Sequence, residues 1–147
     1  LTQIVYKKVD LTMVLNGALA GLVSITAEPL TPGLGAATLI GGVGGVIVVF
    51  AVPLLDKFKI DDVVGAIPVH LIAGIWGTLA VVITNPDATL MAQLTGIVVI
   101  GLFTFIVSLI VWMILAKTMG IRVSEEAEMA GLDNSELGMD SYPEFSR

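Results

Sequence analysis

Four stretches without any Asp, Glu, Lys or Arg dominate this chain of 147 residues and limit what it can fold into. They contain 17, 27, 24 and 29 residues and run over 11–27, 29–55, 63–86 and 88–116. A helix needs about 20 apolar residues to cross the hydrocarbon core of a bilayer. Each stretch is close to or above that length, so the pattern predicts four membrane-spanning helices.

The composition argues against an ordinary soluble domain. Charged residues make up 14% of the chain, whereas soluble domains carry about 25%. The second, third and fourth stretches have no polar face, which the outer helices of a soluble bundle need. They also lack the alternation of apolar and polar residues that membrane-barrel strands require. We therefore expect an all-α fold, a polytopic bundle of membrane helices.

Segments rich in Pro, Gly, Asn and Asp separate the stretches and indicate loops at 28–33, 56–62 and 85–87. Asp87 or Thr89 is a suitable N-cap for the last helix. The membrane region is predicted to cover 1–119 and the polar tail 120–147. Within the membrane region, the predicted helices are 11–27, 34–55, 63–84 and 89–119.

The basic residues predict how the chain is oriented. They lie before the first span, between the second and third, and after the fourth: Lys7, Lys8, Lys57, Lys59, Lys117, Arg122 and Arg147. Four spans therefore place all of them on one side of the membrane. Because Lys and Arg accumulate on the cytoplasmic side, we expect a multi-pass protein of the inner or plasma membrane with both termini and the tail in the cytoplasm.

Small residues recur at helical spacing in the first two spans. Gly17 and Gly21 are four residues apart, as are Gly41 and Gly45. Residues four apart lie on one face of a helix, and a stripe of glycines lets another backbone approach closely. The spacing predicts that these faces are helix contacts.

His70 is the only histidine and lies in the third span. At ~1.5 Å per residue it is about 12 Å along the helix from Asp62, which is within the hydrocarbon depth. An ionisable residue at that depth is a candidate functional residue. In an α-helix Gly74 and Thr78 would share its face, at i+4 and i+8. We interpret His70 as lining a path for a small polar permeant, and a purely structural histidine bonded to another helix is the alternative.

Asn16 in the first span is costly in a membrane unless it bonds across helices or lines water, and both interpretations stay open. No enzyme activity is expected, because a nucleophilic constellation is not visible. We expect no cofactor and no metal site, since the chain has no Cys and a single His. Nucleic acid is not an expected partner either, because the net charge is −6 and no basic patch exists.

Three motifs, in order along the chain, resemble the ammonium transporter family (Amt/Mep/Rh). Residues 61–77, DDVVGAIPVHLIAGIWG, look like its tenth membrane helix, and residues 16–26, NGALAGLVSIT, look like its eighth. The third motif resembles the cytoplasmic tail of that family. It consists of Gly120-Ile121-Arg122-Val123, then Gly131-Leu132-Asp133, then Gly138 and Tyr142-Pro143. Leu137 stands where the tail motif of the family has a histidine.

The resemblance implies ammonium or ammonia transport by an 11-helix protomer with an inverted repeat, assembled as a homotrimer with one pore per subunit. This chain would supply helices eight to eleven and the tail. His70 would be one of a pair of pore histidines, and Thr26 and Asn16 would face the pore or its inner vestibule. The tail would contact neighbouring subunits and PII signalling proteins through Gly120, Arg122, Gly131, Asp133, Gly138 and Tyr142.

The chain begins with Leu1 and shows no signal peptide, which we interpret as a fragment of a longer protein. The alternative is a truncated, non-conducting product that acts as a regulatory or interaction module through its tail. The tail also has local signals of its own. Ser124 before a run of Glu, and Asp133 with Glu136, indicate the starts of two short capped helices.

Overall fold

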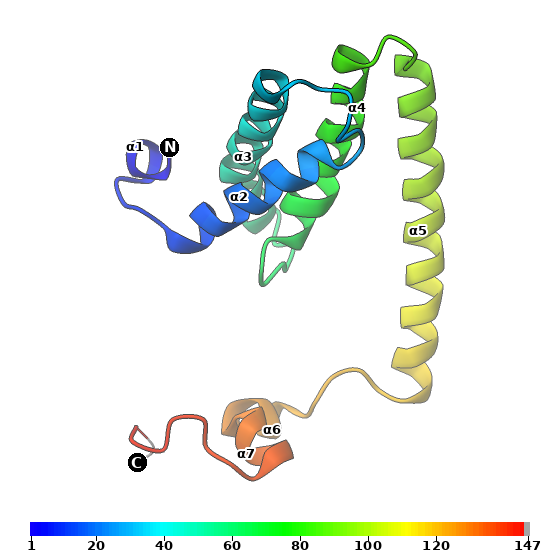
Figure 1. Cartoon of the computed structure of the whole chain (residues 1–147). Helices are drawn as coiled ribbons and strands as arrows, with labels where there is room; N and C mark the ends of the chain where they lie inside the picture. Colours follow the sequence, from blue (N-terminus) through cyan, green and yellow to red (C-terminus); the bar gives the residue numbers. More distant parts are fainter. Residues whose placement is uncertain (146–147) are drawn as a thin grey trace. The chain divides into compact units, whose positions relative to one another are not determined.

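The computed structural model of the chain describes residues 1–145, and these are helical without any strand. The all-α prediction is therefore confirmed. In chain order (Figure 1) the elements are α1 Thr2–Tyr6, α2 Leu11–Ile25, α3 Leu34–Lys57, the π-helix η1 Ile67–Ile72, α4 Ala73–Thr84, α5 Leu90–Thr118, α6 Glu125–Ala130 and α7 Leu132–Leu137.

Among residues 1–145, three helical segments are long and apolar enough to cross a membrane: Leu34–Lys57, Ile67–Thr84 and Leu90–Thr118. The first predicted span, α2, is apolar but has 15 residues. It ends at Ile25 rather than at 27, and the Thr26 hydroxyl donates to the Val23 carbonyl at 2.7 Å in its last turn. Four crossings remain a prediction, in which α2 is the shortest member.

The third span starts later than the sequence indicated. Helix was expected from residue 63, but η1 begins at Ile67 and passes directly into α4 at Ala73. The reason is a turn held by Asp62, whose carboxylate accepts two backbone N–H groups from the residues that follow it. For the last span, Thr89 is the better N-cap of the two candidates, since its hydroxyl accepts from Ala92 N at 3.3 Å.

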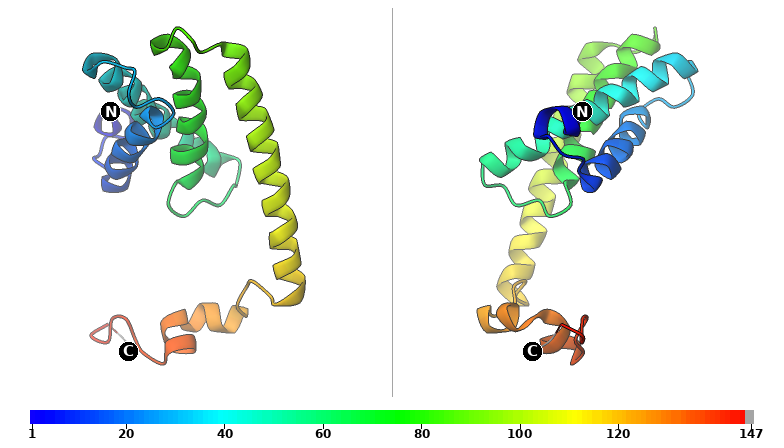
Figure 2. Two further views of the ribbon diagram at one scale, coloured as in Figure 1. Left: turned by 45° about the vertical axis from the view of Figure 1, so that its right-hand side comes forward. Right: turned by 90° about the vertical axis from the view of Figure 1, so that its left-hand side faces the viewer.

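Contacts divide the described residues into two units, and the division falls at Gly101, within α5. In the first unit α2, α3 and the continuous η1–α4 segment pack against one another (Figures 1 and 2). Ala20, Val48, Val69 and Ala73 form the small buried cluster where these helices meet. In α5, every side chain is at least partly exposed.

The glycine stripes of α2 and α3 face each other, as their spacing predicts. A Cβ added to Gly21 would lie 3.3 Å from the Gly41 carbonyl oxygen, and one added to Gly41 would lie 3.3 Å from that of Gly21. One turn away, a Cβ on Gly45 would lie 3.3 Å from the Gly17 oxygen. The two backbones therefore touch directly, which is how small residues stabilise helix pairs in lipid.

Ser24 marks the point where three helices come together. It is buried, and its hydroxyl donates to the Ala20 carbonyl at 2.7 Å. From α3, Gly44 faces the Ser24 hydroxyl, and from α4 a Cβ on Gly77 would lie 2.5 Å from the Ser24 carbonyl oxygen. Side chains larger than hydrogen at these two glycines would therefore push the helices apart.

The short helix α1, which was not predicted from the sequence, supplies a hydrogen-bond donor that α3 lacks. Pro53 lies inside α3 and has no N–H to donate to the Val49 carbonyl four residues earlier. The hydroxyl of Tyr6 at the end of α1 donates to that carbonyl at 2.8 Å. The proline therefore leaves no unsatisfied acceptor there, which matters in an apolar environment.

The tail contains the two short helices that the sequence indicated. Ser124 caps α6 by accepting from Ala127 N at 3.2 Å, so this start is confirmed. The second helix, α7, begins at Leu132 with Gly131 as its N-cap and no side-chain cap bond, so the capped start expected at Asp133 is wrong and Asp133 lies inside the first turn. It ends at Leu137, and the next residue, Gly138, has a φ of 64° in the left-handed region that glycine adopts without strain.

Candidate functional site

Asp62 organises the entry to the third span. One of its carboxylate oxygens accepts from Ala66 N at 2.8 Å and the other accepts from Ile67 N at 2.7 Å. Gly65, between them, has a φ of 76°, which side chains with a Cβ rarely adopt. A negative charge at this end also interacts favourably with the N-terminal end of the helix dipole.

The first turns of the span are π-helical. The Ala73 N–H bonds to the Pro68 carbonyl five residues earlier, where an α-helix would use the carbonyl four residues earlier. Pro68 stands at the start of this segment, where its missing N–H costs little. Short π segments of this kind occur often at functional sites.

His70 lies within η1, and its side chain is exposed while Pro68 and Val69 before it are buried. Within the first unit its imidazole has no hydrogen-bond or ion-pair partner. The α-helical spacing that put His70 on the same face as Gly74 and Thr78 does not apply across the π turn. Gly74 and Thr78 themselves are one α-helical turn apart, and the Thr78 hydroxyl donates to the Gly74 carbonyl at 2.9 Å.

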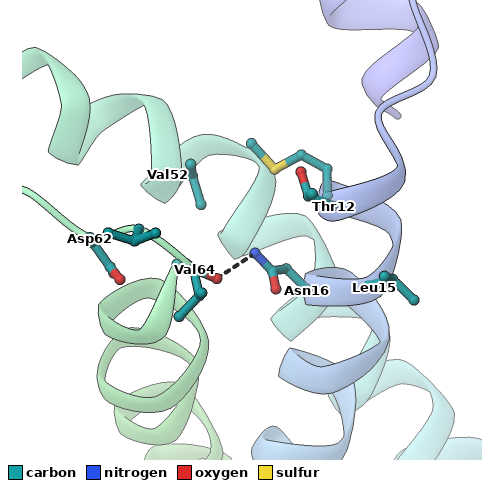
Figure 3. A pocket seen from close by; sticks show the side chains of 9 residues that line it. Thr12, Leu15, Asn16, Val52, Asp62 and Val64 are labelled. Carbon is teal, nitrogen blue, oxygen red and sulfur yellow. Dashed lines mark hydrogen bonds between the residues drawn. The ribbon is translucent and has the colours of Figure 1, made fainter. Parts of the chain in front are cut away.

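Asn16 of α2 bonds across to the loop before η1. Its Nδ2 donates to the Val64 carbonyl oxygen at 3.1 Å (Figure 3). It also lines a hollow of about 290 Å³, together with Thr12, Met13 and Leu15 of α2, Val52 of α3 and residues 62–65. Both interpretations of Asn16 therefore have support, because it ties two segments together and borders a cavity.

The remaining pore candidates lie apart from this hollow. His70, Gly74 and Thr78 do not line it, and neither does Thr26, which is exposed at the C-terminal end of α2. The residues singled out from the sequence therefore do not converge on one cavity within the first unit. Asp62, which does line the hollow, was missed, although an acidic residue just before a helix is a recognisable start signal.

A second polar contact joins the loop after α2 to the loop after α4. Asn85 Nδ2 donates to a carboxylate oxygen of Glu28 at 2.8 Å. Hydrogen bonds from Thr31 and from Asn85 hold the pKa of Glu28 below its ordinary value. The loops at 28–33 and 85–87 were predicted on the same side of the membrane, and this contact agrees with that arrangement.

In the tail, the predicted residues hold local turns. Arg122 forms an ion pair with Glu128, using one guanidinium nitrogen at 2.8 Å from the carboxylate. The Asp133 carboxylate accepts from Ser141 N at 2.8 Å, and this backbone bond, together with a side-chain bond from Ser141, lowers the pKa of Asp133. The bond from Ser141 to Asp133 therefore holds the segment that follows α7 against the first turn of that helix.

Three other tail residues act through backbone geometry or exposure. Gly120 and Gly131 have φ values of 72° and 92°, and a Cβ on Gly131 would lie 2.6 Å from an Asp133 carboxylate oxygen. Tyr142 exposes its ring, and its backbone N–H donates to Asp140 at 2.8 Å. The tail is thus a folded polar segment with an exposed aromatic side chain.

The chain has apolar helices of spanning length that pack through glycines, and one of them carries its single histidine. These features define a multi-pass membrane protein. The family model described as Ammonium Transporter Family matches residues 1–142. The chain belongs to this family, and the resemblance found in its sequence is confirmed.

Two relatives that are named as ammonium transporters support this family assignment. The chain is 41% identical to "Ammonium transporter Amt1" of Haloferax mediterranei, over 94% of this chain and 28% of the relative. It is 39% identical to "Ammonium transporter Amt2" of Archaeoglobus fulgidus, over 94% of this chain and 34% of the relative. The chain therefore spans about a third of the length of these relatives.

Proposed function

We propose that this chain is part of an ammonium transporter and that His70 borders the path of the permeant. The observation that carries the proposal is the exposed imidazole of His70, which has no partner within the first unit, in a stretch of 24 residues without Asp, Glu, Lys or Arg. A polar ring in that position is costly against lipid. A conduit that holds water or a hydrogen-bonding permeant, or a second polar group across it, removes that cost.

The chemistry of imidazole suits the permeant. Ammonium carries a charge, which an apolar conduit disfavours, whereas ammonia is neutral and needs only hydrogen-bond partners. Imidazole has one nitrogen that donates and one that accepts when it is neutral. We propose that ammonium gives up a proton to the solution at the outer end, that ammonia passes His70 and a second histidine from the rest of the protein, and that it takes a proton from the solution inside.

We further propose a homotrimer in the inner or plasma membrane, with one conduit per subunit and the tail in the cytoplasm. The grouping of the seven basic residues supports this orientation. The Glu28–Asn85 contact supports it too, because it ties together the two loops assigned to the outside. The folded tail, with Tyr142 exposed, is the proposed contact for neighbouring subunits and for PII signalling proteins.

Uptake measurements test this function. The full-length protein, expressed in cells that lack their own ammonium transporters, is expected to restore growth on low ammonium and uptake of labelled methylammonium. The 147-residue chain alone is expected to give neither, because it supplies about a third of the length of its relatives. Membrane-inserted full-length protein without uptake would contradict the proposal, and specific capture of a PII protein by that same protein would then favour the non-conducting interaction module.

A further inference from the structure

We propose that Asp62 is a positioning residue for His70, acting through the π-helical segment that carries the imidazole. The carboxylate fixes where the helix starts, and the π turn then fixes the direction of His70 relative to α4. The effect on transport rests on the proposed function of His70, whereas the effect on its direction does not.

The two bonds of Asp62 determine the first helical residues. Its oxygens accept separately from Ala66 N and Ile67 N, at 2.8 and 2.7 Å, so both donors are held by one planar group. These N–H groups lie at the helix start, where no earlier turn supplies acceptors. Without the carboxylate, two donors at the edge of an apolar span would lack these partners, and a different start would compete.

The competing arrangement is the α-helix that the sequence predicts from residue 63. The π turn, closed by Ala73 N to Pro68 O, accommodates one residue more than an α turn does. One residue corresponds to a rotation of ~100° about an α-helix axis. A change from the π to the α arrangement would therefore turn His70 to another side of the span while α4 keeps its place.

Asn16 holds the same loop from a different helix. Its Nδ2 donates to Val64 O at 3.1 Å, directly between Asp62 and Gly65 (Figure 3). Gly65 takes a φ of 76°, and a Cβ on it would lie 2.7 Å from that Nδ2. The segment that leads into η1 is thus restrained both from within by Asp62 and from α2 by Asn16.

Asp61 provides a matched control. It is the adjacent carboxylate, with the same charge and the same position at the membrane edge, but its side chain makes no hydrogen bond or ion pair among residues 1–145. Replacement of Asp61 removes one negative charge without touching the start of η1. Any difference between the two replacements therefore reports on the bonds of Asp62 and not on its charge.

The experiment uses the full-length protein in lipid bilayers with isotope-labelled histidine, read by solid-state NMR. The His70 imidazole signal is identified by its loss in His70→Gln. Asp62→Ala is expected to shift or split this signal and to lower methylammonium uptake, while Asp61→Ala leaves both as in the parent. Asp62→Asn, which keeps one oxygen acceptor, is expected to give a smaller shift and decides the matter if Asp62→Ala does not assemble.

An unshifted His70 signal in the assembled Asp62 variants would overturn the positioning role. That failure is distinct from failure of the proposed function. If His70→Gln transports normally while Asp62→Ala still moves the signal, His70 is positioned as argued but is not needed for transport. If His70→Gln abolishes uptake and the Asp62 variants leave the signal unmoved, the transport role stands and the positioning role falls.

Discussion

Different interactions stabilise the packed helices of the first unit and the folded tail of the second. In the first unit, backbone meets backbone at glycines, and Ser24 sits within reach of both Gly44 and Gly77. In the tail, carboxylates and a hydroxyl bind backbone N–H groups, as Asp133 does with Ser141 and Ser124 does with Ala127. The first arrangement depends on shape and the second on charge and hydrogen bonding.

The difference follows from the two solvents. Lipid tails are as apolar as leucine, so helices in a bilayer gain little from burying apolar side chains and instead rely on close approach. The tail is polar and short, so it gains stability from caps and turns that satisfy free helix ends. Substitutions that add volume are therefore expected to damage the first unit, and changes of protonation are expected to damage the tail.

The largest effect is expected at Gly77. A Cβ there would lie 2.5 Å from the backbone oxygen of Ser24, so Gly77→Ala must shift α4 away from α2. Overpacking of this kind costs about 1–3 kcal/mol, and Gly77→Leu is expected to prevent assembly. The measurement is the yield and thermal midpoint of the full-length protein in mild detergent.

Gly42 is the matched control for Gly77. It lies in α3, and a Cβ there would meet nothing within 4 Å in the described chain. Gly42→Ala makes the same gain in helix propensity as Gly77→Ala without the collision. Equal thermal midpoints for the two alanine variants would show that α2 and α4 do not meet as closely as described.

A smaller effect, confined to the tail, is expected from the protonation of Asp133. Its bonds with Ser141 lower the pKa of the folded form below the ordinary value of 3.8. The stabilisation is therefore fully present above about pH 3.8 and is lost as the pH falls through the lower, folded-state pKa. The protection of the Ser141 amide against hydrogen exchange, relative to its intrinsic rate at the same pH, is expected to fall in that acidic range.

Asp133→Asn is expected to remove most of this pH dependence, because the amide does not change charge. Glu136→Gln is the control. Glu136 is an acidic residue of the same helix whose side chain makes no hydrogen bond in the described chain, so this variant should keep the parent pH profile. Protection of the Ser141 amide that depends on pH in the same way in Asp133→Asn as in the parent would contradict the assignment.

Several features that depend on local spacing were predictable from the sequence, although the cap expected at Asp133 is not the start of α7. The glycine pairs of α2 and α3 were readable because residues four apart share a helix face. The start of α6 at Ser124 was readable because an N-cap bonds to residues that follow it closely. The all-helical class followed in the same way from long runs without charge, which leave few alternatives in a bilayer.

Features that depend on partners distant in the sequence were not predicted. Pro53 shows that Val49 loses a donor, but nothing local shows that Tyr6, 43 residues before Val49, supplies the replacement. Likewise, Glu28 and Asn85 are 57 residues apart. The π turn was missed because a bond to the fourth or the fifth residue back leaves almost the same sequence pattern, and packing decides between them.

The same distinction between local features and distant partners applies to the candidate site. His70 was found because it is the one ionisable residue in its span, but its direction depends on the π turn and on Asp62. Asn16 was noted as a polar residue in an apolar helix, but its partner, the Val64 carbonyl, is 48 residues away. The sequence thus suffices to propose a candidate site residue, whereas the orientation of that residue is set by the fold.

Transport by the alanine variant of His70 shows whether its imidazole borders the path of the permeant. Labelled methylammonium uptake is measured in vesicles that contain equal amounts of assembled full-length protein, either parent, His70→Ala or Thr104→Ala. Thr104 lies exposed on α5 and serves as the control. We expect His70→Ala to lose most of its uptake while Thr104→Ala retains the parent rate. Equal rates for all three proteins would show that His70 does not border the path of the permeant.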